Sequence, residues 1–173
     1  MSQPDEPLFE SETPEPVAAA GQEPPLRDRI HRLVRGQPYA VLCTQGAGQP
    51  YGSLVAFAFT DDLRHAVFAT PTATRKYRLL SECDHVALLI DNRPDRSGKL
   101  MDIEAVTVTG RAQETSRDRR DHDGWAELLV RRHPYLESFV AATSCALFRI
   151  DVIRYLHVHR FQEVRQWIPS DPS

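Results

Sequence analysis

Four side chains that suit a small anion fall within one short segment of the chain. The run Phe68-Ala-Thr-Pro-Thr-Ala-Thr-Arg-Lys76 supplies the hydroxyls of Thr70 and Thr74 and the cations of Arg75 and Lys76. Arginine offers a two-pronged grip on phosphate, and lysine offers a point charge. A phosphomonoester carries about −1.5 to −2 charges at pH 7 and accepts hydrogen bonds. The segment therefore predicts a phosphate site, although its cations alone would equally suit the solvated face of a helix.

This segment joins an expected strand to an expected helix. Residues 66–69 are β-rich, and the sequence from Thr70 to Leu80 then changes to a helical pattern. We expect Thr70 to cap the helix, with Pro71 in its first turn. Because the first amides of a helix have no partner within it, an anion binds well at such a junction.

The rest of the chain is mostly short strands with helices between them. Gly46-Ala-Gly48 between two β-rich runs marks a hairpin turn. A closed barrel is the most economical arrangement, because closure removes exposed strand edges. We predict a mainly β fold, a barrel with peripheral helices. The expected strands span 39–44, 51–59, 66–69, 86–90, 103–111 and 145–158, and the expected helices 26–34, 70–80 and 117–130.

Length and composition predict one folded domain between two tails. The chain has 173 residues, of which 41% are hydrophobic and 26% charged, as is usual for a globular protein with a real core. Residues 1–25 are rich in proline and glutamate and are expected to form a disordered acidic tail. We assign 26–168 to the domain and 169–173 to a second tail.

Charge and cysteine content exclude several classes of protein. A formal net charge of −3 provides no general cationic surface for nucleic acid. The cysteines, Cys43, Cys83 and Cys145, are odd in number and far apart, which fits neither a disulfide framework nor a metal knuckle. No run approaches the ~20 apolar residues of a membrane span. We expect a cytoplasmic protein with no metal, nucleic-acid or membrane partner.

The order of these elements resembles the pyridoxamine 5'-phosphate oxidase-like superfamily of FMN-binding split barrels. The likeness rests on the hairpin, the strand ending in Phe68-Ala-Thr70, the Thr74-Arg-Lys76 helix start and Val86-Ala-Leu-Leu-Ile90. It covers roughly 30–113 well and the C-terminal third in outline. The resemblance implies a Greek-key-like antiparallel barrel of about six strands. It also implies a homodimer that holds FMN between its subunits and acts on a small molecule.

The resemblance also assigns residues to the cofactor. Family positions along the second strand line the flavin with backbone groups, and those at the strand-to-helix junction surround its phosphate. The C-terminal segment has two equally good interpretations. Arg165 or Trp167 reaches the flavin, or the strand simply packs an aromatic side chain against the barrel. The implied residues are Gly52, Ser53, Leu54 and Val55 at the flavin, Ala69, Thr70, Thr74, Arg75 and Lys76 at the phosphate, and Arg165 and Trp167 closing the site.

Several residues differ from those of the true oxidases, so the resemblance supports flavin binding but not the oxidase reaction. Gly52 stands where they have an arginine, Phe57 where they have a substrate-binding lysine, and Ala105 where they have a glutamine. Their C-terminal Arg-Leu-His signature is also missing. The expected function is therefore an FMN-dependent oxidoreductase of unknown substrate. The alternatives are a reductase using the deazaflavin F420, a haem-binding or haem-degrading oxygenase, and a non-catalytic module that stores or senses FMN.

Two histidines near the C-terminus form a further candidate group. His157 and His159 are two apart in an expected strand, so both side chains should point to one face. We expect a polar strand face at the barrel rim, because strand imidazoles usually hydrogen-bond. A metal would need a third ligand, which the sequence does not show. A haem remains the minor alternative on this fold.

Overall fold

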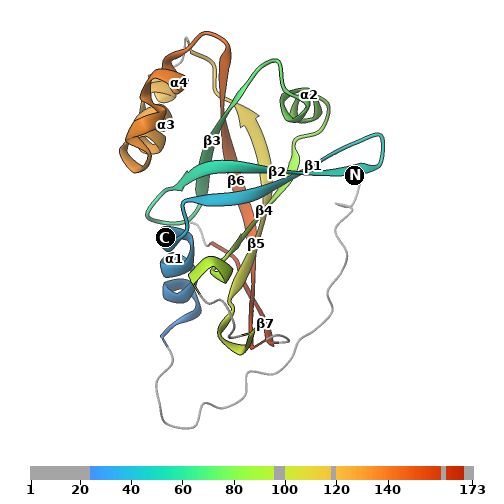
Figure 1. Cartoon of the computed structure of the whole chain (residues 1–173), viewed down its shortest axis with the longest axis vertical. Helices are drawn as coiled ribbons and strands as arrows, with labels where there is room; N and C mark the ends of the chain where they lie inside the picture. The colour runs from blue at the N-terminus through green and yellow to red at the C-terminus, as the bar shows by residue number, and fades with distance from the viewer. Residues whose placement is uncertain (1–23, 96–99, 118–119, 161–162, 170–173) are drawn as a thin grey trace.

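The computed structural model describes residues 24–95, 100–117, 120–160 and 163–169. Within them, antiparallel strands follow the order β3-β2-β1-β4-β5-β6-β7, and an added β3–β6 pairing closes the first six into a barrel (Figure 1). This confirms the predicted barrel. The strands are β1 Tyr39–Gly46, β2 Gln49–Phe59, β3 His65–Pro71, β4 His85–Asp91, β5 Ala105–Glu114, β6 Cys145–His159 and β7 Glu163–Trp167.

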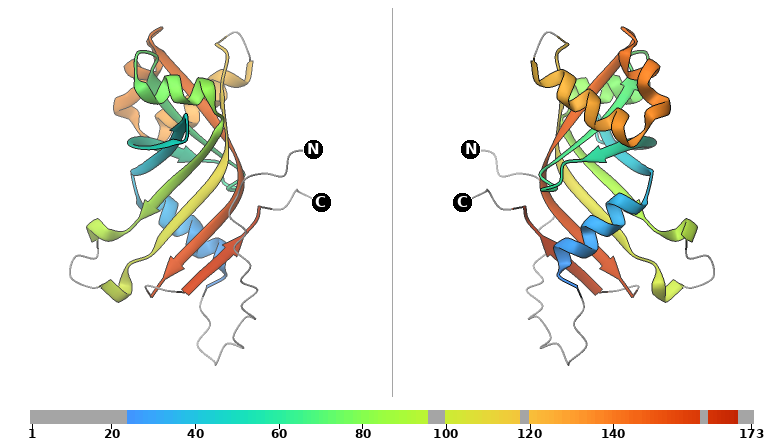
Figure 2. Two further views of the ribbon diagram at one scale, coloured as in Figure 1. Left: turned by 90° about the vertical axis from the view of Figure 1, so that its right-hand side faces the viewer. Right: turned by 90° about the vertical axis from the view of Figure 1, so that its left-hand side faces the viewer.

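Helices lie around the barrel rather than within the sheet (Figure 2). Helix α1 packs its apolar stripe of Ile30, Leu33 and Val34 into the barrel core, as its spacing predicts. Among the described helices, none combines the length and the apolar run that crossing a membrane requires. The α-helices are α1 Leu26–Gly36, α2 Arg75–Glu82, α3 Arg120–Arg132 and α4 Glu137–Ala141, and the short 3-10 turns are Arg93–Asp95, Leu100–Asp102 and Pro134–Leu136.

Strand β6 closes the barrel because it serves three partners. Its first half pairs with β3, its last five residues pair with β7, and β5 runs along most of its other edge. Side chains alternate between the barrel interior and its surface, so Phe68 and Phe148 stack inside with ring centroids 5.4 Å apart. A smaller cluster outside the barrel, including Val67 and Leu147, is covered by Leu129 of α3.

The junction between β3 and α2 differs from the sequence prediction. Thr70 does not cap the helix, and Pro71 does not lie in its first turn, because both residues complete β3 by pairing with β6. Helix α2 begins at Arg75, and the Thr74 side chain accepts the Tyr77 amide as its cap. The sequence placed the helix start one turn too early, since both threonines suit a cap.

The β1–β2 hairpin holds α2 in place. Ala47 and Gly48 adopt φ values of 50° and 78°, the left-handed pair that a two-residue hairpin turn requires, and the predicted turn is confirmed. A Cβ added at Gly46 would lie 2.3 Å from the Leu79 side chain of α2. The absence of a side chain at Gly46 therefore lets the hairpin and the helix pack together.

The predicted tails are not tested by the structure. Residues 1–23 and 170–173 lie outside the described residues, so the assignment of 1–25 and 169–173 to tails stays a prediction.

Candidate functional site

Hydrogen bonds fix the two threonines of the strand-to-helix junction. Thr74 Oγ1 donates to the Pro71 carbonyl at 2.9 Å and accepts the Tyr77 amide at 3.3 Å. Because its single proton is used in this way, Thr74 accepts the hydroxyl of Thr70 at 3.0 Å. Thr70 is 1% exposed and reaches the junction through this contact. The threonines thus shape the start of α2, whose first amides have no partner within the helix.

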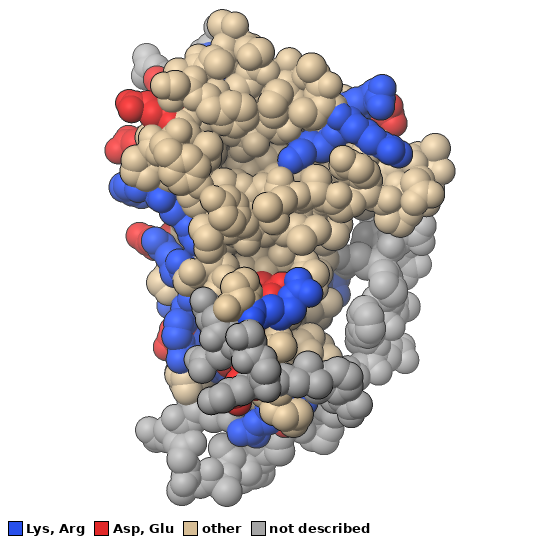
Figure 3. Space-filling view, in the orientation of Figure 1, with Lys and Arg blue, Asp and Glu red and all other residues tan. Residues whose placement is uncertain are grey.

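Both cations of the junction are anchored to strand β2. Lys76 Nζ donates to the Leu54 carbonyl at 3.2 Å, and the Arg75 guanidinium lies 5.0 Å from the centre of the Tyr51 ring. Partial burial lowers the pKa of Lys76. A space-filling view shows basic side chains gathered over α2, beside a face with little charge (Figure 3). The interpretation of these cations as a solvated helix face is therefore incomplete. Arg75 is exposed, but its guanidinium also contacts the Tyr51 ring.

The neighbouring residue of β2 carries a polar atom without a partner. The Ser53 hydroxyl is buried and has no hydrogen-bond partner within the described part of the chain. A buried hydroxyl of this kind costs free energy unless a bound molecule satisfies it. Leu54, whose carbonyl holds Lys76, is 65% exposed, and Gly52 is also exposed. Because successive side chains of a strand point to opposite faces, the buried Ser53 hydroxyl and the exposed Leu54 side chain lie on opposite faces of β2.

Two other predicted residues contribute no side chain to this surface. Val55 is 4% exposed and belongs to the barrel core. Ala69 packs against the cluster beneath α3. Only their backbone groups are available for a role here, which for Val55 is the role that the family resemblance implies, whereas Ala69 of β3 is implied to lie beside the phosphate.

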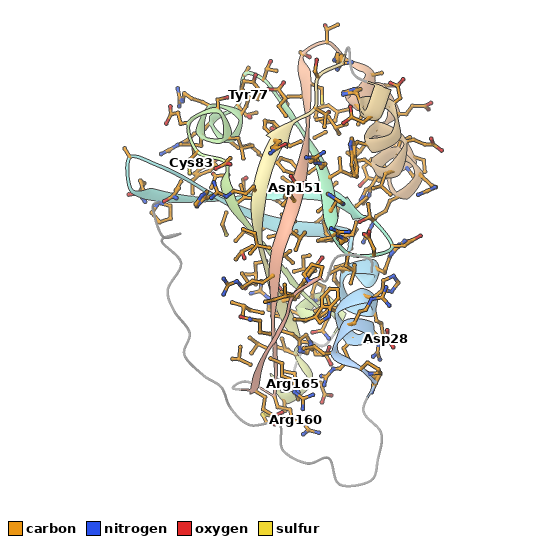
Figure 4. The ribbon with its side chains drawn as sticks, turned by 180° about the vertical axis from the view of Figure 1, so that it is seen from behind. Asp28, Tyr77, Cys83, Asp151, Arg160 and Arg165 are labelled. Atoms are coloured by element: carbon orange, nitrogen blue, oxygen red, sulfur yellow. The ribbon has the colours of Figure 1, made fainter. Side chains whose placement is uncertain are left out.

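The C-terminal pair lies elsewhere in the same chain. Arg165 and Tyr77 of α2 are at opposite ends of the barrel (Figure 4). Trp167 packs on Tyr155 with ring centroids 5.2 Å apart, beside the core. One chain therefore does not bring Arg165 and Trp167 to the β3–α2 junction, and Trp167 has the aromatic packing role that the sequence left open.

The two histidines share one face but do not form a polar rim. His157 is 0% exposed and His159 3%, with ring centroids 5.7 Å apart. His157 Nε2 lies 3.3 Å from Glu104, whose other oxygen accepts Arg29 of α1 at 3.0 Å. His159 Nε2 lies 3.2 Å from Glu163. The predicted polar face at the barrel rim is therefore buried, although His157 forms the hydrogen bond that such a face predicts.

Interactions within this buried histidine group shift the pKa values of His157 and Glu104. Burial lowers the pKa of His157, against the opposite effect of its hydrogen bond to Glu104. Burial tends to raise the pKa of Glu104, but Arg29 and His157 outweigh it and the net pKa is lowered. Sequence reasoning missed Glu104 and Arg29, which are 53 and 128 residues from His157 and carry no shared local pattern. Among the described residues, no cluster of three or more His, Cys, Asp or Glu is placed to hold a metal.

The family resemblance implies that Phe57 stands where the true oxidases have a substrate-binding lysine. Phe57, at the matching position, is fully buried in the barrel and contacts the Phe59 ring. A cation could not replace it there without losing core packing. This agrees with the departures noted in the sequence.

A family model described as pyridoxamine 5'-phosphate oxidase matches residues 26–158. The chain belongs to the pyridoxamine 5'-phosphate oxidase family. A family relative from Streptomyces rimosus subsp. rimosus, named 5a,11a-dehydrotetracycline/5a,11a-dehydrooxytetracycline reductase, is 33% identical over 117 residues. That match covers 64% of this chain and 79% of the relative.

Solved structures similar to this family member confirm the fold. A haem-binding protein from Mycobacterium smegmatis has a TM-score of 0.75 at 14% identity, and the match covers 86% of this chain. The chain spans only 60% of that protein. An FAD-binding protein from Mesorhizobium loti has a TM-score of 0.61 at 17% identity, covering 76% of this chain and 90% of that one. At such identities the likeness concerns the barrel alone.

Proposed function

We propose that the chain binds FMN, with the flavin phosphate at the β3–α2 junction, and acts as a flavin-dependent reductase of a small molecule. The observation that carries this is the anchoring of both junction cations to β2. The Lys76–Leu54 hydrogen bond and the Arg75–Tyr51 contact hold two positive charges beside the open amides of α2. A dianionic phosphate suits that combination of fixed charge and donors.

The remainder of the flavin suits the neighbouring strand. The exposed Leu54 side chain is available to the apolar surface of the ring system, and the backbone of Gly52 and Ser53 to its polar edge. Gly52 leaves the backbone open to close approach, since it has no side chain. A bound flavin supplies hydride transfer, while these residues bind and orient it.

The reductase activity is supported by the Streptomyces relative. The name of that relative describes reduction of a dehydrotetracycline, and the two chains are 33% identical over 117 residues. Phe57 argues against the oxidase reaction, because the lysine that would hold the oxidase substrate is replaced by a buried ring. We therefore place the substrate among neutral, largely apolar ring compounds rather than pyridoxamine phosphates.

A homodimer is part of this proposal. Strands β1, β2 and β4 form an outward apolar groove of about 790 Å³ that includes Val41, Leu54 and Leu89. Covering such a surface is favourable at about 25 cal/mol per Å² of apolar area. Arg165 and Trp167 would then complete the site from the partner subunit. Leu54→Asp should convert a dimer to monomer in sedimentation velocity, and a monomeric wild-type protein would contradict this part.

The experiment that tests the function identifies the cofactor first. The absorption spectrum of protein purified without added cofactor, followed by mass spectrometry of what heat releases, should show FMN. Release of deazaflavin or haem instead would overturn the FMN assignment. Anaerobic reduction of the bound flavin, followed by its reoxidation with an unsaturated ketone, should then show reductase chemistry. A flavin that binds but never transfers electrons would indicate a storage or sensor module.

A further inference from the structure

One turn of the chain connects the β3–α2 junction to the α3–α4 pair. Thr72 follows β3, and both its amide and its hydroxyl donate to the Ser144 carbonyl, at 2.9 Å and 3.2 Å. These two residues are 72 positions apart in the sequence. Figure 1 shows α2, α3 and α4 at the same end of the barrel, around the ends of β3 and β6. The placement of Thr72 therefore depends on the turn between α4 and β6 that carries Ser144.

Arg117 holds the turn between α4 and β6. Its guanidinium donates to the Cys145 carbonyl at 3.0 Å and to the carbonyls of 140–142. These acceptors lie on both sides of Ser144 in the chain. An arginine can hold several carbonyls at once because its planar guanidinium carries five N–H donors. Cys145 also pairs with Pro71, so the turn held by Arg117 leads directly to the last residue of β3.

Hydrogen bonds rather than close packing fix the position of Thr72. The residue is exposed, and a cavity of about 490 Å³ lies beside it. Arg117 and His122 of α3 line the same cavity. Because this space is open, the two hydrogen bonds to the Ser144 carbonyl, and not contacts with α3, set where Thr72 lies.

The segment 114–117, between β5 and α3, also contacts α2 directly. The Tyr77 hydroxyl donates to Glu114, the last residue of β5, at 3.1 Å. Tyr77 lies in the first turn of α2, where the Thr74 side chain accepts its amide. The first amides of α2 are the donors offered to the phosphate, and their direction follows the orientation of this turn. Segment 114–117 therefore restrains the start of α2 by two routes, through Tyr77 and through the turn that carries Ser144.

We propose that Arg117 is a positioning residue for the flavin phosphate and acts without touching it. Arg117 fixes the turn between α4 and β6, the Ser144 carbonyl fixes Thr72, and Thr72 fixes the way in which the chain enters α2. The first amides of the helix, those of Arg75 and Lys76, are thereby held in one direction. Direction matters because hydrogen bonds weaken steeply as they depart from linearity. This inference rests on the proposed function, since it concerns the phosphate at the β3–α2 junction.

A simpler role for Arg117 is to cap α4. A basic side chain near the last carbonyls of a helix stabilises that helix, and two of the carbonyls held by Arg117 belong to the end of α4. A cap alone would change the stability of the folded chain and would treat flavins with and without a phosphate alike. A positioning residue changes only the part of the affinity that the phosphate contributes. Two measurements separate these roles.

Amide hydrogen exchange tests the hold of Arg117 on the turn, in the full chain without flavin. Arg117→Lys keeps the positive charge but loses the planar fork. The Thr72 amide should then exchange about fivefold faster, the effect of weakening one hydrogen bond. The amide of Val108, buried in the middle of β5, reports opening of the whole barrel and should keep its wild-type rate. Equal acceleration of both amides, or an unchanged rate at Thr72, would overturn the proposal.

Flavin titration tests the positioning role itself. Arg117→Ala should weaken FMN binding by about fivefold and leave riboflavin binding unchanged, with a smaller loss in Arg117→Lys. Arg131→Ala is the matched control, because it removes the same charge from an exposed position on α3 and should change neither affinity. A wild-type preference for FMN that persists in full in Arg117→Ala, or equal weakening of both flavins, would overturn the proposal alone. A wild type that binds FMN no better than riboflavin would overturn the phosphate site of the proposed function, and this role of Arg117 with it.

Discussion

The two ends of the barrel differ in the partners of their charged side chains. At the β7 end, Glu104 accepts hydrogen bonds from Arg29 and from His157 Nε2 beneath α1, while His157 Nδ1 has no hydrogen-bond partner among the described residues. At the α2 end, the Ser53 hydroxyl has no partner among the described residues, and Lys76 reaches only a backbone carbonyl. In the sequence, the segment with Arg75 and Lys76 was the main candidate site, and the pair His157 and His159 was a minor one. The buried ion-pair cluster at one end contributes to stability, whereas the two partly exposed cations held at the strand-to-helix junction suit an anionic ligand better.

Breaking the closed cluster should have the largest effect on stability. Glu104→Ala removes the partner of Arg29, which is 8% exposed, and leaves its buried guanidinium without that carboxylate. We expect the free energy of unfolding to fall by about 2 to 3 kcal/mol, measured by urea denaturation. Affinity for FMN should change little, because the cluster lies at the far end of the barrel.

Glu163 provides the matched control for that variant. It also pairs with a histidine, His159, but its side chain is 48% exposed. Glu163→Ala should therefore cost less than about 1 kcal/mol. Equal losses for the two glutamate variants would contradict a special role for the Arg29–Glu104–His157 cluster.

The pH dependence of the free energy of unfolding also tests the comparison between the two ends of the barrel, and its expected effect is smaller than that of Glu104→Ala. Burial lowers the pKa of both His157 and His133 in the folded chain. Between each folded pKa and the ordinary value of 6.5, the unfolded chain binds more protons, so stability rises with pH there. The stability that the two neutral histidines contribute is fully present above about pH 6.5, and it is lost as the pH falls towards the folded pKa.

Removing one histidine should flatten this dependence in part. His157→Gln should show a smaller loss of melting temperature between neutral and mildly acidic pH, and adding His133→Gln should reduce the loss further. A control at the open end, Lys76→Ala, should keep the full slope. An unchanged slope in the double histidine variant would show that other groups cause it.

Local patterns predicted most of the elements and the phosphate segment. Alternation located the strands, the 3.6-residue spacing located α1, and Gly46-Ala-Gly48 located the hairpin turn. Thr70 was misplaced as a cap because strand pairing with Ala146, a residue far along the chain, decides where β3 ends. Local sequence contains no information about that partner.

Long-range contacts explain what the sequence missed at the sites. No sequence motif surrounds His133. Its hydrogen bond to the Phe57 carbonyl, and the contact of its neighbour Tyr135 with Tyr39, both depend on the fold. The burial of His157 likewise depends on α1 and β7, which no periodicity links to it. The residue types near one turn were enough to predict an anion site. Hydrogen bonds between residues far apart in the sequence could be identified only from the folded structure.

The central claim is that the β3–α2 junction binds the flavin phosphate, and comparison of FMN with riboflavin tests it most directly. Fluorescence titration should show that wild-type protein prefers FMN, and that Arg75→Ala with Lys76→Ala weakens FMN by about 100-fold while riboflavin, which lacks the phosphate, is unaffected. Arg78→Ala, an exposed cation on the same helix, should leave both affinities unchanged. Equal binding of FMN and riboflavin by the wild type, or an unchanged FMN affinity in the double variant, would contradict the account.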